Sequence, residues 1–223
     1  MFDLIYYDIK SILKRDPAAR NMLDVVLCYP GFHAVLMHRI AHWFYGRGFM
    51  LIARCISVIN RFITGVEIHP AAKIGKGLFI DHGMGVVIGE TAEIGDNVTM
   101  YQGATLGGTG KDTGKRHPTI GNNVVISSGA KVLGPFKVGD NSKIGAGSVV
   151  LEEVPPNCTV VGVPARVVRR NKKVIKMTLD EIDLDQVKLP DPIQEQFRRM
   201  MDRINMLERK VLELEDYITD EAV

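Results

Sequence analysis

This 223-residue sequence has few cysteines, a small net charge and only short apolar segments, and each of these features excludes a class of protein. The three cysteines, Cys28, Cys55 and Cys158, are far apart and form no CxxC pair, which excludes a disulfide framework and a cysteine-based zinc site. This usage is typical of a reducing compartment. The formal net charge of +2 is too small to favour a nucleic-acid partner.

Signals for membrane insertion and export are also missing. The most apolar segment, residues 50–59, contains Arg54 and is far shorter than a membrane span. The first residues lack the basic segment and apolar core of a signal peptide. We therefore expect a cytoplasmic protein with no membrane partner.

Residues 1–65 are predicted to form an α-helical domain, because their apolar residues recur at three- and four-residue spacing. Asp16 before Pro17 predicts a helix N-cap. The pair Pro30-Gly31 predicts a turn between helices.

The middle of the chain has a period of six. Apolar residues occupy thirteen positions of this repeat, in three registers: Ile68, Ile74, Ile80; Ile88, Ile94, Met100, Leu106; and Ile120, Ile126, Val132, Val138, Ile144, Val150. Glycine often follows them and permits a sharp corner. Three hexapeptides then make one triangular coil, and stacked coils bury an aliphatic column. We predict a mainly β fold, a left-handed parallel β-helix over 66–168, in preference to a β-sandwich with glycine-rich turns.

The remainder is predicted to be a linker, 169–191, and a C-terminal coiled-coil helix, 192–219. Eight apolar residues alternate four- and three-residue spacing: Ile193, Phe197, Met200, Ile204, Leu207, Val211, Leu214 and Ile218. A coiled coil implies self-association. An amphipathic helix packed on its own domain is the alternative.

Function should reside where the repeat is interrupted, because regular coils contain only packed aliphatic side chains. The first interruption contains Asp81 and His82. The second is the polar, glycine-rich loop 107–119, which contains Arg116 and His117.

These interruptions belong to a set of motifs that resembles one family. The motifs are Asp16-Pro17-Ala18, Gly31-Phe32-His33-Ala34, and the segments 68–75, 81–82, 105–111, 116–118 and 143–150. Together they resemble the serine O-acetyltransferases of cysteine biosynthesis, which belong to the hexapeptide-repeat acyltransferases. The resemblance covers about residues 3–170. It implies transfer of the acetyl group of acetyl-CoA to the hydroxyl of L-serine.

Acetyl transfer needs a base, because a serine hydroxyl is a poor nucleophile at neutral pH. Imidazole is suited to this role, and the resemblance assigns it to His82. It also implies that a carboxylate orients the imidazole. The similar enzymes often have Asp where this sequence has Glu67.

The amino-acid acceptor has a carboxylate and an ammonium group. Arg116 offers a bidentate partner for the carboxylate, with His117 beside it. The resemblance implies that Asp16 and Asp81 bind the ammonium group. It also places five residues along coenzyme A: Gly108, Thr109, Ser128, Lys143 and Ala146. No metal is expected.

The resemblance also bears on partners. In that family the site lies between neighbouring β-helices, so a homotrimer is expected, with L-cysteine as a feedback inhibitor. The similar enterobacterial enzymes end in an isoleucine that docks into O-acetylserine sulfhydrylase. This sequence ends in Val223, so the sequence leaves that complex open.

Three other functions fit parts of the sequence. A sugar or antibiotic O-acetyltransferase would share the fold but needs no Arg and paired carboxylates for a zwitterion. A hydratase of the γ-carbonic anhydrase type needs a zinc-binding H-x4-H pair on the β-helix, and the pair here, His33 and His38, falls in a predicted helix. A non-catalytic scaffold would not need histidines at both interruptions.

Overall fold

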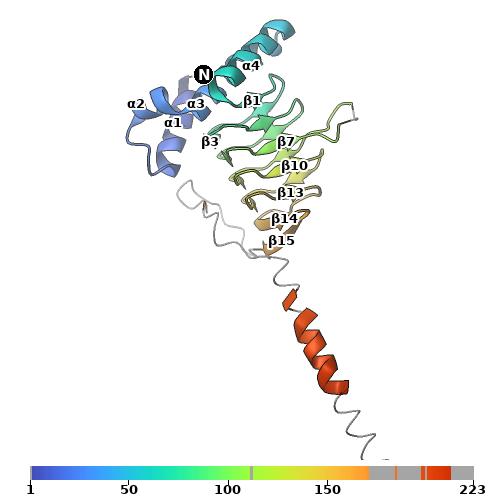
Figure 1. The fold of residues 1–223 in the computed structure, drawn as a ribbon. Helices are drawn as coiled ribbons and strands as arrows, with labels where there is room; N and C mark the ends of the chain where they lie inside the picture. The colour runs from blue at the N-terminus through green and yellow to red at the C-terminus, as the bar shows by residue number, and fades with distance from the viewer. Residues whose placement is uncertain (1, 111–112, 171–183, 185–196, 199, 212–223) are drawn as a thin grey trace, which may run out of the picture. The chain divides into compact units, whose positions relative to one another are not determined.

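The computed structural model describes residues 2–110, 113–170, 184, 197–198 and 200–211 (Figure 1). The chain divides into two compact units, residues Met1–Leu189 and Pro190–Val223. None of the helices in the described ranges is long and apolar enough to cross a membrane.

Four helices begin the first unit: α1 (Phe2–Arg15), α2 (Met22–Cys28), α3 (Pro30–Tyr45) and α4 (Met50–Thr64). The N-cap prediction for Asp16 is wrong. Asn21 caps α2 instead, accepting the backbone N–H of Asp24 at 3.0 Å, whereas Asp16 accepts the N–H of Ala18 in a turn after α1. The predicted break between two helices is present but lies one residue earlier, at Tyr29. Pro30 is the first residue of α3, a position where the N–H that proline lacks would have no partner within the helix.

Parallel strands follow and form three sheets. Sheet A contains β1 (Glu67–Ile68), β4 (Val87–Ile88), β7 (Thr105–Gly107), β10 (Lys131–Leu133) and β13 (Val149–Val150). Sheet B contains β2 (Lys73–Ile74), β5 (Glu93–Ile94), β8 (Thr119–Ile120) and β11 (Lys137–Val138). Sheet C contains β3 (Phe79–Asp81), β6 (Thr99–Tyr101), β9 (Val125–Ile126), β12 (Lys143–Ile144), β14 (Cys158–Gly162) and the antiparallel β15 (Ala165–Arg170). The prediction of a left-handed parallel β-helix with helices before and after it is confirmed.

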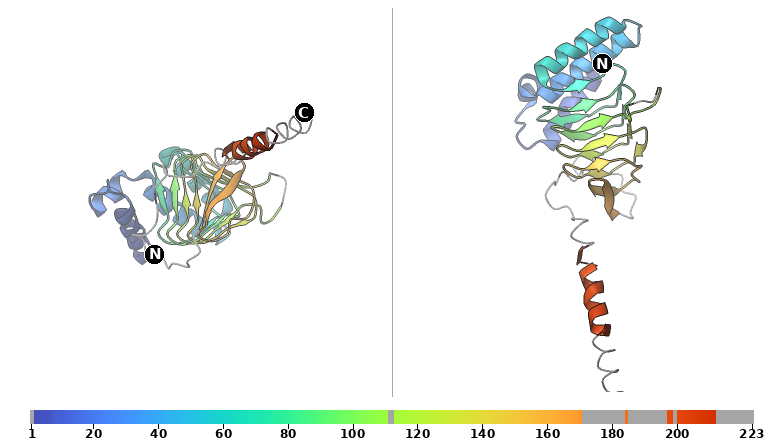
Figure 2. Two further views of the ribbon diagram at one scale, coloured as in Figure 1. Left: turned by 90° about the horizontal axis from the view of Figure 1, so that it is seen from below. Right: turned by 45° about the vertical axis from the view of Figure 1, so that its right-hand side comes forward.

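The strand register shows where the repeat is interrupted. In a regular coil Lys131 pairs with Val149, eighteen positions further along the chain. The first coil is two residues longer, since Glu67 pairs with Val87. The coil after Thr105 is eight residues longer than a regular one, since Thr105 pairs with Lys131. Both interruptions predicted from the sequence are therefore confirmed, and the second leaves the coil between β7 and β8 (Figures 1 and 2).

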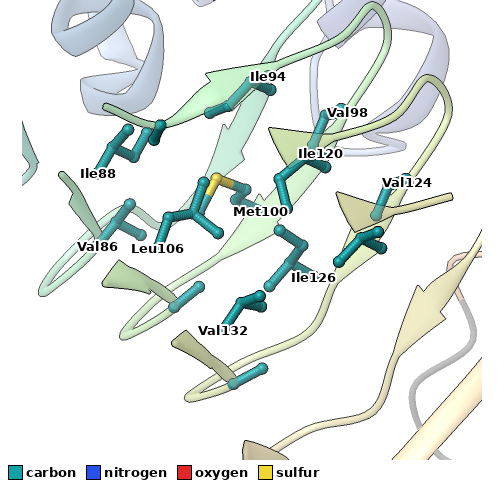
Figure 3. Packing of buried hydrophobic residues seen from close by; sticks show 14 of the residues in the cluster. Val86, Ile88, Ile94, Val98, Met100, Leu106, Ile120, Val124, Ile126 and Val132 are labelled. Atoms are coloured by element: carbon teal, nitrogen blue, oxygen red, sulfur yellow. The ribbon is translucent and has the colours of Figure 1, made fainter. Parts of the chain in front are cut away.

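The repeated apolar residues point into the β-helix from all three sheets (Figure 3). Twelve of the thirteen predicted positions are buried, and the other, Ile74, is half-buried and packs against the same core. Burial of a Val, Leu or Ile side chain stabilises the fold by about 1.5–3 kcal/mol.

A column of asparagines lines the corner between sheets B and C. Asn97, Asn123, Asn141 and Asn157 all have φ of 54–58°, a conformation that asparagine tolerates better than most residues. Each of the first three donates its side-chain N–H to the next, at 3.0–3.4 Å. Tyr7 of α1 donates to Asn97 at 2.9 Å and so joins the helices to the first coils.

Arg15 connects α1 to the β-helix through several hydrogen bonds. It is 5% exposed, and burial lowers the pKa of its guanidinium to about 10. The guanidinium donates to the carbonyls of Asn97 and Val98 at 3.2 and 3.1 Å and to the Thr99 hydroxyl at 2.8 Å. It also contacts the Gly77 carbonyl.

Arg15→Ala is expected to destabilise the protein by about 2–4 kcal/mol, because it removes the hydrogen bonds of a buried guanidinium to the Asn97 and Val98 carbonyls and to the Thr99 hydroxyl, and leaves a cavity in their place. Arg20→Ala is the matched control: Arg20 is exposed and pairs with Asp24 at 3.2 Å, and such pairs contribute little. Urea unfolding measures both. Equal midpoints for the two variants would show that Arg15 does not anchor α1.

The second unit contains a helix at residues 200–211 whose apolar side chains are all exposed. It confirms the predicted C-terminal helix, while its pairing as a coiled coil stays a prediction. Most of the predicted linker 169–191 and both ends of the predicted helix 192–219 lie outside the described residues.

Candidate active site

The first interruption of the repeat forms an exposed corner between sheets C and A. Strand β3 ends at Asp81, and His82 follows with φ of 59°. The His82 side chain is 73% exposed, with Nε2 3.9 Å from Oδ1 of Asp81. A positive φ is uncommon for a non-glycine residue, although His, Asn and Asp adopt it more often than others, and such backbone positions are concentrated at functional sites.

Helix α3 packs tightly against β3 and brings further groups to this corner. A Cβ on Gly31 would lie 2.0 Å from the carbonyl oxygen of Ile80, so only glycine allows this approach. Just before α3, the Tyr29 hydroxyl donates to Oδ2 of Asp16 at 2.7 Å. The predicted residues Asp16, Asp81 and His82 therefore lie in one cluster, to which Tyr29 belongs.

Negative charge accumulates in this cluster. Burial raises the pKa of Asp81, and the charge of Asp16 raises it further, whereas His82 opposes the rise. Burial and the bond to Asp16 raise the pKa of Tyr29. A cation bound between the two carboxylates would relieve their repulsion.

Glu67 lies on β1, next to Val87 of β4. Its carboxylate is paired with Arg61 at 2.9 Å. Within the described ranges there is no hydrogen bond or ion pair between Glu67 and His82.

The second interruption holds Arg116 and His117 against the loop that follows β4. The Arg116 guanidinium contacts the Glu90 carboxylate, and this bond lowers the pKa of Glu90. Thr91 binds both predicted residues: its hydroxyl accepts the backbone N–H groups of Arg116 and His117 at 3.0 and 3.1 Å. Burial and the Arg116 charge lower the pKa of His117.

The two predicted groups do not meet within one chain. His82 lies in the connection from sheet C to sheet A, whereas Arg116 and His117 lie in the connection from sheet A to sheet B. The charges that act on Asp81 come from His82 and Asp16, and those that act on His117 come from Arg116, Glu90 and Lys115. The two sets share no residue.

The predicted coenzyme A residues are divided in the same way. Ser128 and Ala146 follow β9 and β12, on the same edge of the β-helix as His82, and the N–H of Gly147 bonds to the Ser128 carbonyl at 2.9 Å. Gly108 and Thr109 lie on the loop that holds Arg116. The fifth, Lys143, is buried on β12.

Tyr29, Glu90 and Thr91 contact predicted site residues but were not themselves predicted from the sequence. A signal for two of them exists in the repeat. Residues twenty-six positions apart stack in the long coil, so Glu90 falls beside Arg116 and Thr91 beside His117. Tyr29 has no comparable signal, because helix packing places it.

The described residues contain no group of three or more His, Cys, Asp or Glu that could hold a metal ion. The family model for the bacterial transferase hexapeptide (six repeats) matches residues 117–152. A serine acetyltransferase of Bacillus pumilus is 55% identical over 96% of this chain and 96% of its own length. One of Synechococcus elongatus is 52% identical over all of this chain and 89% of its own. The chain belongs to the serine acetyltransferase family.

Solved structures of serine acetyltransferases share its fold. A Brucella abortus serine acetyltransferase in complex with coenzyme A aligns with a TM-score of 0.75 and 49% identity, covering 76% of this chain and 68% of that one. A Neisseria gonorrhoeae enzyme in complex with serine aligns with a TM-score of 0.73 and 45% identity, over 75% and 69% of the two chains. A serine acetyltransferase in complex with cysteine aligns with a TM-score of 0.79 and 41% identity, covering 84% of this chain and 71% of that one.

Proposed function

We propose that this member of the serine acetyltransferase family transfers the acetyl group of acetyl-CoA to the hydroxyl of L-serine, producing O-acetylserine and CoA for cysteine biosynthesis. The observation that carries the proposal is the corner at His82, where an exposed imidazole is held in a strained conformation beside two carboxylates. The comparisons favour this function over acetylation of a sugar or antibiotic.

His82 is the proposed general base. Its imidazole takes the proton of the serine hydroxyl while the oxygen attacks the thioester carbonyl. The imidazolium then returns this proton to the sulfur of CoA as the carbon–sulfur bond breaks, so no net proton is gained or lost. Glu67 is the proposed orienting carboxylate, and it must exchange its partner Arg61 for His82 to act in this way.

Charge supports the proposed binding of serine. Asp16 and Asp81 offer two carboxylates to the ammonium group, and Tyr29 fixes the direction of one of them. Arg116 faces the serine carboxylate together with His117. A guanidinium has five N–H donors, so its contacts with Glu90 and Gly114 leave donors for a bidentate bond.

Coenzyme A is proposed to lie against Gly108, Thr109, Ser128 and Ala146, which are all exposed or half-buried. Their backbone groups and small side chains suit a pantetheine arm. Lys143 is the weakest of the five predicted residues, because its side chain is buried within β12.

A homotrimer would join the two halves of the site, with the His82 corner of one copy facing the Arg116 loop of the next. Helix α4 supports association, because it exposes Leu51, Val58 and Phe62, the last 91% exposed. A solvent-exposed apolar face of this kind is typical of an interface.

The charged residues of the helix at 200–211 favour a parallel arrangement of this helix in neighbouring copies. Its apolar face contains Ile204, Leu207 and Val211. Arg203 and Glu208 flank that face, and in a parallel coiled coil they lie opposite each other on neighbouring helices. An antiparallel pair would place like charges together.

Feedback inhibition by L-cysteine and a cytoplasmic location are also proposed, the first because cysteine can occupy the same carboxylate and ammonium sites as serine. The sequence left a complex with O-acetylserine sulfhydrylase open, and the chain end on which it depends lies outside the described residues.

Release of CoA thiol from acetyl-CoA tests the proposed function. We expect release with L-serine and at least tenfold less with L-threonine or L-homoserine, whose extra methyl or methylene group displaces the hydroxyl from the base. A panel of sugars and aminoglycosides should also give at least tenfold less, because a site for a zwitterion leaves its charged groups unpaired when a sugar binds. Release that depends on a sugar or aminoglycoside but not on serine would overturn it.

A further inference from the structure

The loop after β4 makes a closed set of hydrogen bonds around one imidazole. Both lone pairs of the Thr91 hydroxyl are occupied, because it accepts the backbone N–H groups of Arg116 at 3.0 Å and His117 at 3.1 Å. The hydroxyl therefore has only its proton left to offer. Its remaining neighbour is Nδ1 of His117, at 2.9 Å.

The same ring nitrogen faces a second donor. The backbone N–H of Thr91 also points to Nδ1 of His117, at 3.2 Å. A nitrogen that faces two donors must be an acceptor, so it carries no proton. In a neutral imidazole the proton then resides on Nε2.

Two glycines fix the position of the Nε2 edge. A Cβ on Gly89 would lie 2.1 Å from Nε2, and one on Gly108 would lie 3.3 Å from it. The ring therefore lies between two stretches of backbone, and at Gly89 no other residue would leave room for it. Nε2 itself has no hydrogen-bond partner among the residues described.

From these contacts we infer that Thr91 is a positioning residue that locks His117 in one neutral tautomer and presents its Nε2–H as a donor to the acceptor substrate. The inference deepens the proposed function and rests on it for the identity of the ligand: the Nε2–H would bind the carboxylate of the amino acid beside Arg116. The tautomer itself does not depend on the substrate.

The surrounding charges support a neutral ring. Burial, Arg116 and Lys115 lower the pKa of His117, whereas Glu90 acts in the opposite direction. His69 faces the same cluster: burial and the charge of Arg54 lower its pKa most, and Arg116 and His117 lower it further. An imidazole with no proton on Nδ1 is neutral, and it can still donate its Nε2–H at neutral pH.

The tautomer can be read from long-range nitrogen–proton NMR spectra of the full chain labelled at histidine with nitrogen-15. The spectrum of His117→Gln identifies the His117 signals by their loss. We expect one protonated nitrogen, Nε2, and one bare nitrogen, Nδ1, from pH 6 to 8. A protonated Nδ1, or exchange between the two tautomers, in the wild-type protein would overturn the inference.

Thr91→Val and Thr91→Ser separate the hydroxyl from the rest of the side chain. The valine variant leaves Nδ1 with one donor fewer, so the NMR pKa of His117 should rise and kcat/KM for serine should fall roughly 5- to 100-fold. The serine variant should match the wild type in both. A fall in kcat/KM in the valine variant with an unchanged His117 titration would reduce Thr91 to a structural role and overturn the inference.

The two kinds of failure are distinguishable. If serine is not the acceptor, thiol release with serine is absent in every variant while the wild-type tautomer remains as inferred. If the valine variant does not fold, the wild-type and Thr91→Ser spectra still decide the question.

Discussion

His82→Asn is expected to lower kcat for serine acetylation by roughly 10²- to 10⁴-fold, the range that a positioned general base contributes. Asparagine is the suitable replacement because His82 has φ of 59° and the four other non-glycine residues with positive φ among the described ones are all asparagines. The variant therefore removes the base and keeps the backbone. Steady-state thiol release at saturating serine and acetyl-CoA measures the effect.

His33→Ala is the matched control. His33 lies on α3, and its ring bonds to the Val26 carbonyl at 2.7 Å instead of to a carboxylate. We expect its kcat to remain within a few-fold of wild type. Full activity of His82→Asn, with an unchanged unfolding midpoint, would exclude His82 as the base.

Arg116→Ala is expected to lower kcat/KM for serine by roughly 30- to 1000-fold, because truncating a charged partner of a carboxylate costs about 2–4 kcal/mol. It also leaves the Glu90 carboxylate without its guanidinium. The KM for acetyl-CoA should change far less, so the two substrates are varied separately. Arg166→Ala, an exposed arginine of β15, is the control and should leave both constants unchanged.

Loss of affinity for acetyl-CoA rather than for serine in Arg116→Ala would contradict the proposed role. It would place the guanidinium beside a phosphate, another anion that arginine binds well.

The period of six predicted most of the fold, because it depends on which side chains can be buried. Each of the thirteen positions from Ile68 to Val150 meets the same requirement, so the pattern is visible without knowing any contact. The interruptions were visible for the same reason. The contacts between outward-facing side chains were missed, because predicting them requires the length of each coil as well as the apolar pattern: Thr91 stacks on His117, twenty-six positions later, in a coil that is eight residues longer than a regular one.

The N-cap prediction for Asp16 was wrong for a different reason. Asp16-Pro17 has the composition of a helix start, but the carboxylate is used twice, by the Ala18 N–H and by the Tyr29 hydroxyl. Asn21 then begins the next helix. The partner of Asp16 comes from a segment thirteen positions away, which no local pattern indicates.

We propose that the two interruptions of the hexapeptide repeat form one acetyl-transfer site shared between copies of the chain. Co-expressing His82→Asn and Arg116→Ala chains, each nearly inactive alone, tests it most directly. In trimers assembled at random from equal amounts of the two chains, about one quarter of all sites combine an intact His82 with an intact Arg116 from the next copy, and about one third do so in the trimers that contain both chains. We predict serine-dependent thiol release near one quarter of the wild-type rate. No recovery in purified mixed assemblies would contradict the claim and place both groups within a single copy.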